Sequence, residues 1–171
     1  PGLAPLIAAP ILLGIPAPMA GRIMTLVFGT LLLVLMYLLV RRVYGPSPAL
    51  VVLFLAAVSS HLITASTNGM AEAPALCALA GALALILPVG ASRSPWYFLM
   101  AGLLLGYMFS IRSEGIVYFA GIVLALPVSL WRHRRHLLLS VGCLTAGFVL
   151  LGGAAMMARG KAPTLEAGTD M

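Results

Sequence analysis

Charged side chains are scarce in this chain. Of its 171 residues only 8% are Asp, Glu, Lys or Arg, whereas 62% are hydrophobic. A soluble globular domain carries about 25% charged residues, which it needs to cover a water-facing surface. The composition therefore excludes an ordinary soluble domain and indicates a protein whose surface largely faces lipid.

Cysteine is nearly absent, and several motifs that would support chemistry are missing. Cys77 and Cys143 both lie inside apolar runs, and the sequence contains no CxxC motif and no Cys/His cluster. We interpret the two cysteines as small core residues, which indicate nothing about the redox compartment. The sequence also contains no nucleophile–base pair, no phosphate-binding loop and no metal-binding motif.

Acidic residues are the scarcer charged type, with 4 Asp and Glu against 10 Lys and Arg, which gives a net charge of +6. In a soluble protein this balance would suggest nucleic acid, but here no basic helix face is interleaved with aromatic residues. The basic residues gather instead in short loops, as the orientation of a membrane protein requires. We therefore expect membrane lipids and no nucleic acid among the partners.

Six apolar runs separated by short polar or proline-rich stretches predict an all-α, polytopic transmembrane helical bundle. Five prolines interrupt the first 19 residues, so a short helix, interfacial or partly re-entrant, is expected before the first span. Glycines at 102 and 106 and at 147 and 152 would let helices approach closely, although ordinary glycine use in membrane helices explains them equally well. The predicted spans are residues 21–40, 49–65, 70–87, 96–111, 115–130 and 137–157.

Alternating spans sort the charges between two sides of the membrane. One side receives six basic residues and no acidic ones: Arg41, Arg42, Arg93, Arg132, Arg134 and Arg135. The positive-inside rule places this side, including the run 132–136, in the cytoplasm. All four acidic residues then lie outside. We expect a transmembrane domain over residues 1–157, followed by a polar extracytoplasmic tail over 158–171.

Arg112 and Glu114 are the strongest candidates for a functional site, because they form a charged pair between two apolar runs. Positions two apart on one helix do not face each other, so a shared site requires a turn, which Gly115 permits. The functional interpretation is a site for an anionic group, with the Arg112 guanidinium as a fork that matches phosphate. The alternative is a hairpin turn with two snorkelling charges.

Three further residues are candidates. Glu72 begins a span, where it serves either the site or the positive end of the helix dipole. Arg22, at another outer helix end, is a candidate to join Arg112. His61 is a lone histidine near a helix end, for which a structural bond to a neighbouring hydroxyl is the main interpretation and a ligand-facing role the alternative.

Several short segments point to one family. These are residues 20–24 (AGRIM), 37–45 (YLLVRRVYG), 68–74 (NGMAEAP), and 102–106 (GLLLG) leading to 111–115 (IRSEG). Together they resemble membrane segments of polytopic glycosyltransferases of the GT-C class, in the branch of protein O-mannosyltransferases and aminoarabinose transferases. The last pair resembles the pattern GLLLGLAxLTRPEG, with Ile111 and Ser113 in place of Thr and Pro. The resemblance covers roughly residues 1–157.

The resemblance implies transfer of a sugar from a polyprenyl-phosphate donor on the extracytoplasmic face of the plasma (inner) membrane. It also implies a catalytic acidic residue in a first outer loop that precedes Pro1, so we interpret the chain as a fragment without a catalytic residue. Arg112, Glu114, Glu72 and Arg22 would then shape the cavity for the lipid phosphate and the sugar. The cofactor is left open, with a divalent cation as the candidate.

Two alternatives come from other classes of protein. A transporter or flippase half places charges and broken helices near the bilayer midplane, whereas the spans here keep their charges at their ends. A non-catalytic membrane scaffold is the second alternative, because the loop expected to carry catalysis lies outside the sequence. The charge pattern favours a cavity on the outer face over a midplane pathway.

Overall fold

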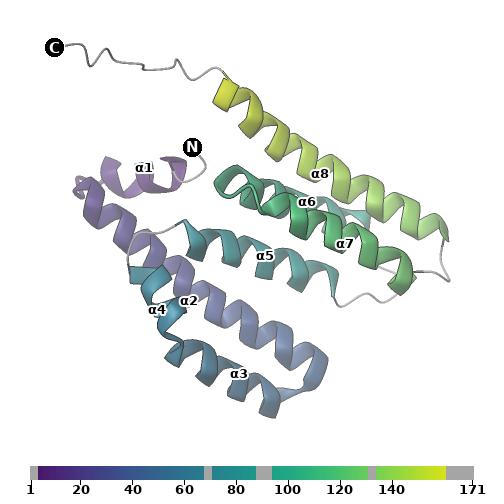
Figure 1. Cartoon of the computed structure of the whole chain (residues 1–171), viewed down its shortest axis with the longest axis horizontal. Helices are drawn as coiled ribbons and strands as arrows, with labels where there is room; N and C mark the ends of the chain where they lie inside the picture. The colour runs from purple at the N-terminus through teal and green to yellow at the C-terminus, as the bar shows by residue number, and fades with distance from the viewer. Residues whose placement is uncertain (1–3, 68–70, 88–93, 131–133, 161–171) are drawn as a thin grey trace.

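The computed structural model describes residues 4–67, 71–87, 94–130 and 134–160, and all regular elements in these ranges are α-helices (Figure 1). The predicted all-α class is therefore confirmed. The helices are α1 (Ala4–Leu12), α2 (Ala17–Tyr44), α3 (Pro46–Val58), α4 (Ser60–Thr67), α5 (Glu72–Ile86), α6 (Pro95–Ile111), α7 (Gly115–Leu130) and α8 (Arg134–Gly160).

Two glycines set the boundaries of the first long helix. Gly14, with φ 84°, makes the turn after α1, and Gly45, with φ 92°, separates α2 from α3. Both lie in the left-handed region that glycine adopts without steric cost. α2 begins before the predicted span because Pro18 lies in its first turn, where the missing N–H breaks no hydrogen bond.

Two helices are long and apolar enough to cross a membrane, Ala17–Tyr44 and the Leu137–Met157 part of α8. The other predicted spans correspond to shorter apolar helices of 10–17 residues. The predicted span 49–65 is not one helix, because Ser59 has extended backbone (φ −63°, ψ 114°) and separates α3 from α4. Of the six predicted spans two are therefore clear, within a bundle whose outward faces carry large apolar side chains such as Phe54 and Leu124.

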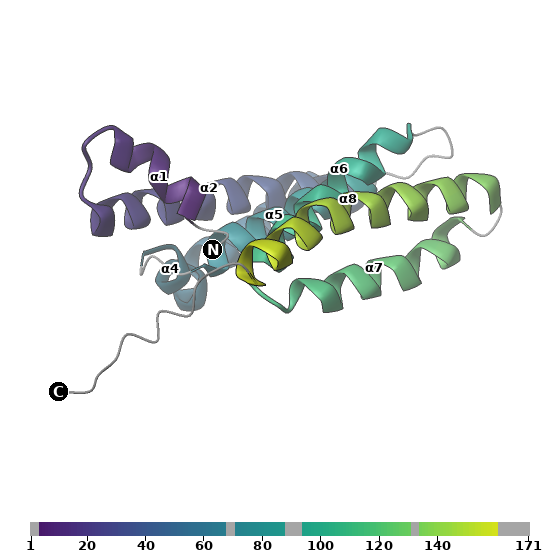
Figure 2. The same cartoon turned by 90° about the horizontal axis from the view of Figure 1, so that it is seen from above.

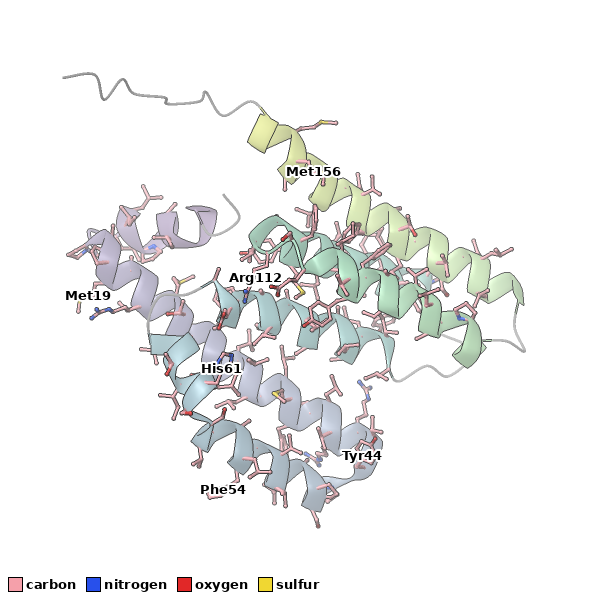
Figure 3. The ribbon with its side chains drawn as sticks, viewed as in Figure 1. Met19, Tyr44, Phe54, His61, Arg112 and Met156 are labelled. Carbon is pink, nitrogen blue, oxygen red and sulfur yellow. The ribbon has the colours of Figure 1, made fainter. Side chains whose placement is uncertain are left out.

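Apart from α4, which continues onward from the end of α3, successive helices run in alternating directions, and this gives the bundle two ends (Figures 1 and 2). The start of α5, the end of α6 and the start of α7 lie at one end, and the connection between α2 and α3 lies at the other. In Figure 3, Tyr44 is accordingly far from His61 and Arg112. Arg41 and Arg42 thus lie at the end opposite the predicted site residues, as alternating spans predict.

α5 is the central helix, packed against both α2 and α6. Its buried surface is built largely from alanine, and the buried alanines are Ala73, Ala75, Ala78, Ala80 and Ala82. Small side chains let a helix approach neighbours on more than one side. Because α5 begins with Glu72, this packing fixes the position of that carboxylate relative to α6.

The α6–α8 contact is closer still, because backbone meets backbone at glycine. A Cβ atom on Gly102 would lie 2.1 Å from the carbonyl oxygen of Leu144, and one on Gly147 would lie 2.4 Å from that of Leu99. The glycines noted in the sequence therefore serve close helix approach. The core beside this contact is formed by Ala82, Ile86, Phe98, Ala101, Leu105, Leu126 and Leu144.

Candidate functional site

The site lies where α6 ends and α7 begins. Arg112 caps α6 with extended backbone (φ −135°, ψ 129°), and its N–H still donates to the carbonyl oxygen of Met108 at 2.8 Å. The backbone then turns through Ser113 and Glu114, and Gly115 starts α7. The turn predicted from the charged pair and the glycine is confirmed.

The reason for glycine at 115 differs from the expected one. Its φ is not positive, since among the described residues only Gly14 and Gly45 have positive φ. A Cβ atom on Gly115 would instead lie 2.6 Å from the backbone nitrogen of Phe109. Glycine is needed here because α7 starts against the last turn of α6, and not because the turn requires an unusual backbone conformation.

Three aromatic rings, one from each of α6, α7 and α8, pack together near this turn. Phe148 of α8 stacks on Phe119 of α7, with ring centroids 4.1 Å apart, and lies 5.6 Å from the ring of Phe109 in α6. Aromatic pairs at these separations add to the stability gained from burial alone. The helices on both sides of the α6–α7 turn are thus packed against a third helix, α8.

Arg112 joins the two predicted carboxylates. Its Nη1 donates to Glu72 Oε1 at 3.0 Å, and its Nη2 donates to Glu114 Oε1 at 3.3 Å. The structure therefore brings together three of the four predicted site residues, from the start of α5 and the α6–α7 turn. Helix dipoles favour the arrangement, since Glu72 lies at the positive end of α5 and Arg112 at the negative end of α6.

His61 adds a fourth polar group to this cluster. Its Nε2 lies 3.8 Å from Glu72 Oε2, and its side chain is 77% exposed. Figure 3 shows His61 and Arg112 at the same end of the bundle. The sequence suggested a neighbouring hydroxyl as the main partner of His61, but in the structure the histidine lies beside a carboxylate. In the sequence, the feature that indicates this proximity is the polar stretch that follows His61 and leads towards Glu72.

Arg22 is not brought into the cluster. It lies on α2 with an exposed side chain, and none of the ion pairs in the described ranges involves it. The four clustered side chains come instead from α4, α5 and the α6–α7 turn. We refer to His61, Glu72, Arg112 and Glu114 as the polar cluster.

The polar cluster has two carboxylates and one guanidinium, so its net charge is −1 while His61 is neutral. The side chains of Arg112 and Glu114 are 36% and 58% exposed, and a ligand can approach them from water. The guanidinium can donate to phosphate oxygens, and the carboxylates can accept from hydroxyl groups. Over the described residues, no group of three or more His, Cys, Asp or Glu is placed to hold a metal ion.

Two apolar cavities lie against α2 near the polar cluster, one between α2, α3 and α4 and the other between α2 and α5. One, of about 270 Å³, is lined by Ala73, which follows Glu72, and by Leu62, which follows His61. The second, of about 320 Å³, shares Leu32 and Leu62 with the first and continues along α5 as far as Leu83. Apolar surface therefore lies close to the charged side chains.

Fold and site together define a polytopic membrane protein with an ion-paired cluster at one end of an α-helical bundle. Residues 6–157 match the family model described as dolichyl-phosphate-mannose-protein mannosyltransferase. The chain belongs to this family of membrane glycosyltransferases of the mannosyltransferase type, which confirms the resemblance noted in the sequence. No curated protein and no solved structure matches the chain.

Proposed function

We propose that this chain forms the donor-binding part of a membrane glycosyltransferase that uses a sugar linked to a polyprenyl phosphate, on the extracytoplasmic face of the plasma (inner) membrane. The observation that carries the proposal is the pairing of Arg112 with Glu72 and Glu114 at 3.0 and 3.3 Å. A guanidinium held at a helix end, partly open to water, suits a phosphate that arrives on a lipid.

In this proposal the ion-paired members of the cluster have separate roles. Arg112 binds the phosphate, Glu72 orients the guanidinium, and the carboxylates can accept hydrogen bonds from sugar hydroxyls. When a hydroxyl of the acceptor forms a bond to the sugar and the bond between the sugar and the phosphate oxygen breaks, negative charge grows on the departing phosphate. A preorganised guanidinium stabilises that charge in the transition state more than in the ground state.

The apolar cavities support a lipid-linked donor. One, between α2, α3 and α4, is lined by Leu62 and Ala73, which follow His61 and Glu72 in the chain. The other lies between α2 and α5, and both are lined mainly by leucine and alanine side chains. Burying an isoprenoid chain there would be favourable by about 0.8 kcal/mol for each CH₂ removed from water. The charged head and the apolar tail of one molecule would thus meet complementary surfaces.

Donor preference tests this function. Membranes containing the full-length protein should release polyprenyl phosphate from polyprenyl-phosphate mannose, detected by mass spectrometry of the extracted lipids. The same membranes should not consume GDP-mannose when the lipid-linked donor is omitted. Consumption of the nucleotide sugar alone would contradict the proposal, and membranes without the protein serve as the control.

The orientation of the bundle has its own test. In a background with Cys77 and Cys143 replaced by alanine, Ser113→Cys should react with a membrane-impermeant maleimide added to intact cells. Ser92→Cys and His133→Cys, whose positions lie outside the described residues, should react only after the cells are permeabilised. The charge asymmetry between the two sides is the physical reason, and labelling at position 133 from outside would show that the orientation is reversed.

A further inference from the structure

Arg112 has two carboxylate partners that are held very differently. Glu72 is 24% exposed and lies 3.0 Å from Nη1, whereas Glu114 is 58% exposed and lies 3.3 Å from Nη2. An ion pair is stronger at short range and with less solvent screening. The two Nη groups of one guanidinium are therefore bound with unequal strength.

Glu72 is anchored by the helix that carries it. It starts α5, and the three residues that follow, Ala73, Pro74 and Ala75, are all buried against neighbouring helices. Its carboxylate also lies at the positive end of the α5 dipole and reaches a group 40 residues away in the sequence. The backbone of Glu72 is therefore held by packing, and its less exposed side chain has less room to turn into water than that of Glu114.

The Glu114 side chain, by contrast, does not help to hold its turn together. The turn around it is held by backbone hydrogen bonds, from Gly115 N to Arg112 O at 3.1 Å and from Val117 N to Glu114 O at 2.9 Å. These bonds do not involve the Glu114 side chain. The carboxylate can therefore leave Nη2 and turn into water while the backbone of the turn stays as it is.

We propose that Glu114 is an exchangeable partner of Arg112, whose carboxylate competes with the donor phosphate for Nη2 while Glu72 keeps Nη1. This rests on the proposed function, because it assumes that a phosphate binds Arg112. The exchange replaces one anion by another on a guanidinium that is already oriented. Nη1 and Nη2 of Arg112 thus each keep an anionic partner, whichever anion occupies Nη2.

The exchange affects the relative affinity of the site for the donor phosphate and for the product phosphate. A sugar-linked phosphodiester carries one negative charge, whereas the monoester released by transfer carries about −1.5 to −2 at pH 7. The additional charge would strengthen binding to Arg112, but Glu114 competes for the same nitrogen and repels it at close range. Glu114 thereby lowers the affinity for the product more than the affinity for the donor.

Binding of two short probes to the full-length protein in nanodiscs tests this role. The probes are farnesyl phosphate, a monoester, and methyl farnesyl phosphate, a diester, with farnesol as the uncharged control. Glu114→Gln should tighten binding of the monoester about tenfold, which corresponds to about 1.4 kcal/mol, and that of the diester by less. Farnesol binding should not change. Glu114→Asp, which retains the carboxylate, should stay close to the wild type.

Two further variants separate exchange from other effects. In the Arg112→Ala background Glu114→Gln should no longer tighten binding of the monoester, because the competition requires the guanidinium. Glu72→Gln removes the same charge from the anchored partner and should weaken binding. The proposal is overturned if Glu114→Gln does not tighten monoester binding, if the tightening persists without Arg112, or if Glu72→Gln tightens binding equally.

The same measurement keeps this proposal distinct from the proposed function. If the wild type and Arg112→Ala bind farnesyl phosphate equally well, Arg112 does not contact phosphate, and the donor-binding role itself is wrong. If Arg112→Ala weakens binding while Glu114→Gln changes nothing, the donor-binding role stands and Glu114 does not compete.

Discussion

Replacing Arg112 with alanine should lower sugar transfer by roughly ten- to a hundredfold at a fixed concentration of the lipid-linked donor. Hydrogen bonds to charged groups contribute about 1.5–3 kcal/mol, and each 1.4 kcal/mol corresponds to about a factor of ten. The loss follows from removing both the charge and the fork that meets the phosphate. The measurement is the initial rate of polyprenyl-phosphate release by the full-length protein.

Replacing Arg112 with lysine should give an intermediate rate. Lysine keeps the positive charge but offers a single ammonium group instead of a planar fork. One ammonium cannot reproduce the two separate contacts that Nη1 and Nη2 make with Glu72 and Glu114. Arg41→Ala is the matched control and should leave the rate close to that of the wild type, because Arg41 is in the last turn of α2, which ends at the opposite end of the bundle.

Folded yield distinguishes a functional role of Arg112 from a structural one. The ion pairs of Arg112 are partly exposed, and exposed pairs contribute only about 0–1 kcal/mol to stability. Both variants should therefore fold with near-normal yield. Full transfer activity of Arg112→Ala would mean that the turn is a hairpin with non-functional charges. Loss of folded protein in both variants would make Arg112 a structural partner of the carboxylates.

The second large effect should come from Gly102→Ala. A methyl group at this position would lie 2.1 Å from the Leu144 carbonyl oxygen, so α6 and α8 would have to separate. Overpacking of a well-packed core costs about 1–3 kcal/mol and occasionally more, which is a large share of a typical stability of about 5–15 kcal/mol. We expect a marked loss of monodisperse protein and a lower unfolding temperature, followed by fluorescence-detected size-exclusion after heating.

Gly142→Ala is the matched control for this experiment. Gly142 lies on α8, the helix that packs against α6, but no atom lies within 4 Å of a Cβ placed there. Alanine is a better helix former than glycine, so this variant should be as stable as the wild type or slightly more stable. Equal behaviour of Gly102→Ala and Gly142→Ala would show that the helices do not touch at glycine.

The sequence predicted which residues share an end of the bundle, but not which of them pair. Alternation of spans placed Arg22, Glu72, Arg112 and Glu114 on one side, and the positions of the helix ends agree with this. The contact between Glu72 and Arg112 joins residues 40 apart in sequence. It depends on α5 and α6 packing side by side with these two residues level, which the hydrophobic pattern does not encode.

The break at Ser59 shows a different limit of sequence reasoning. The chain from Ala49 to Ala65 contains no internal proline or glycine, which are the residues that usually mark an interruption. The polar Ser59, Ser60 and His61 indicated a weak point, but one continuous span was predicted. The interruption starts a new helix, α4, and His61 in its first turn lies beside Glu72. The local sequence alone did not decide whether the helix breaks here, and in the structure the break occurs together with this tertiary contact.

The unequal lengths of the helices have a consequence for the surrounding bilayer. α2 has 28 residues, about 42 Å at 1.5 Å per residue. α7, with exposed Val117 and Leu124, has 16, about 24 Å against a hydrocarbon core of about 30 Å. Where α7 crosses the bilayer, the lipid beside it would have to thin, whereas α2 would have to tilt or protrude. Because α7 starts directly after Glu114, such a thinned region would lie next to the polar cluster and bring headgroups and water towards Arg112.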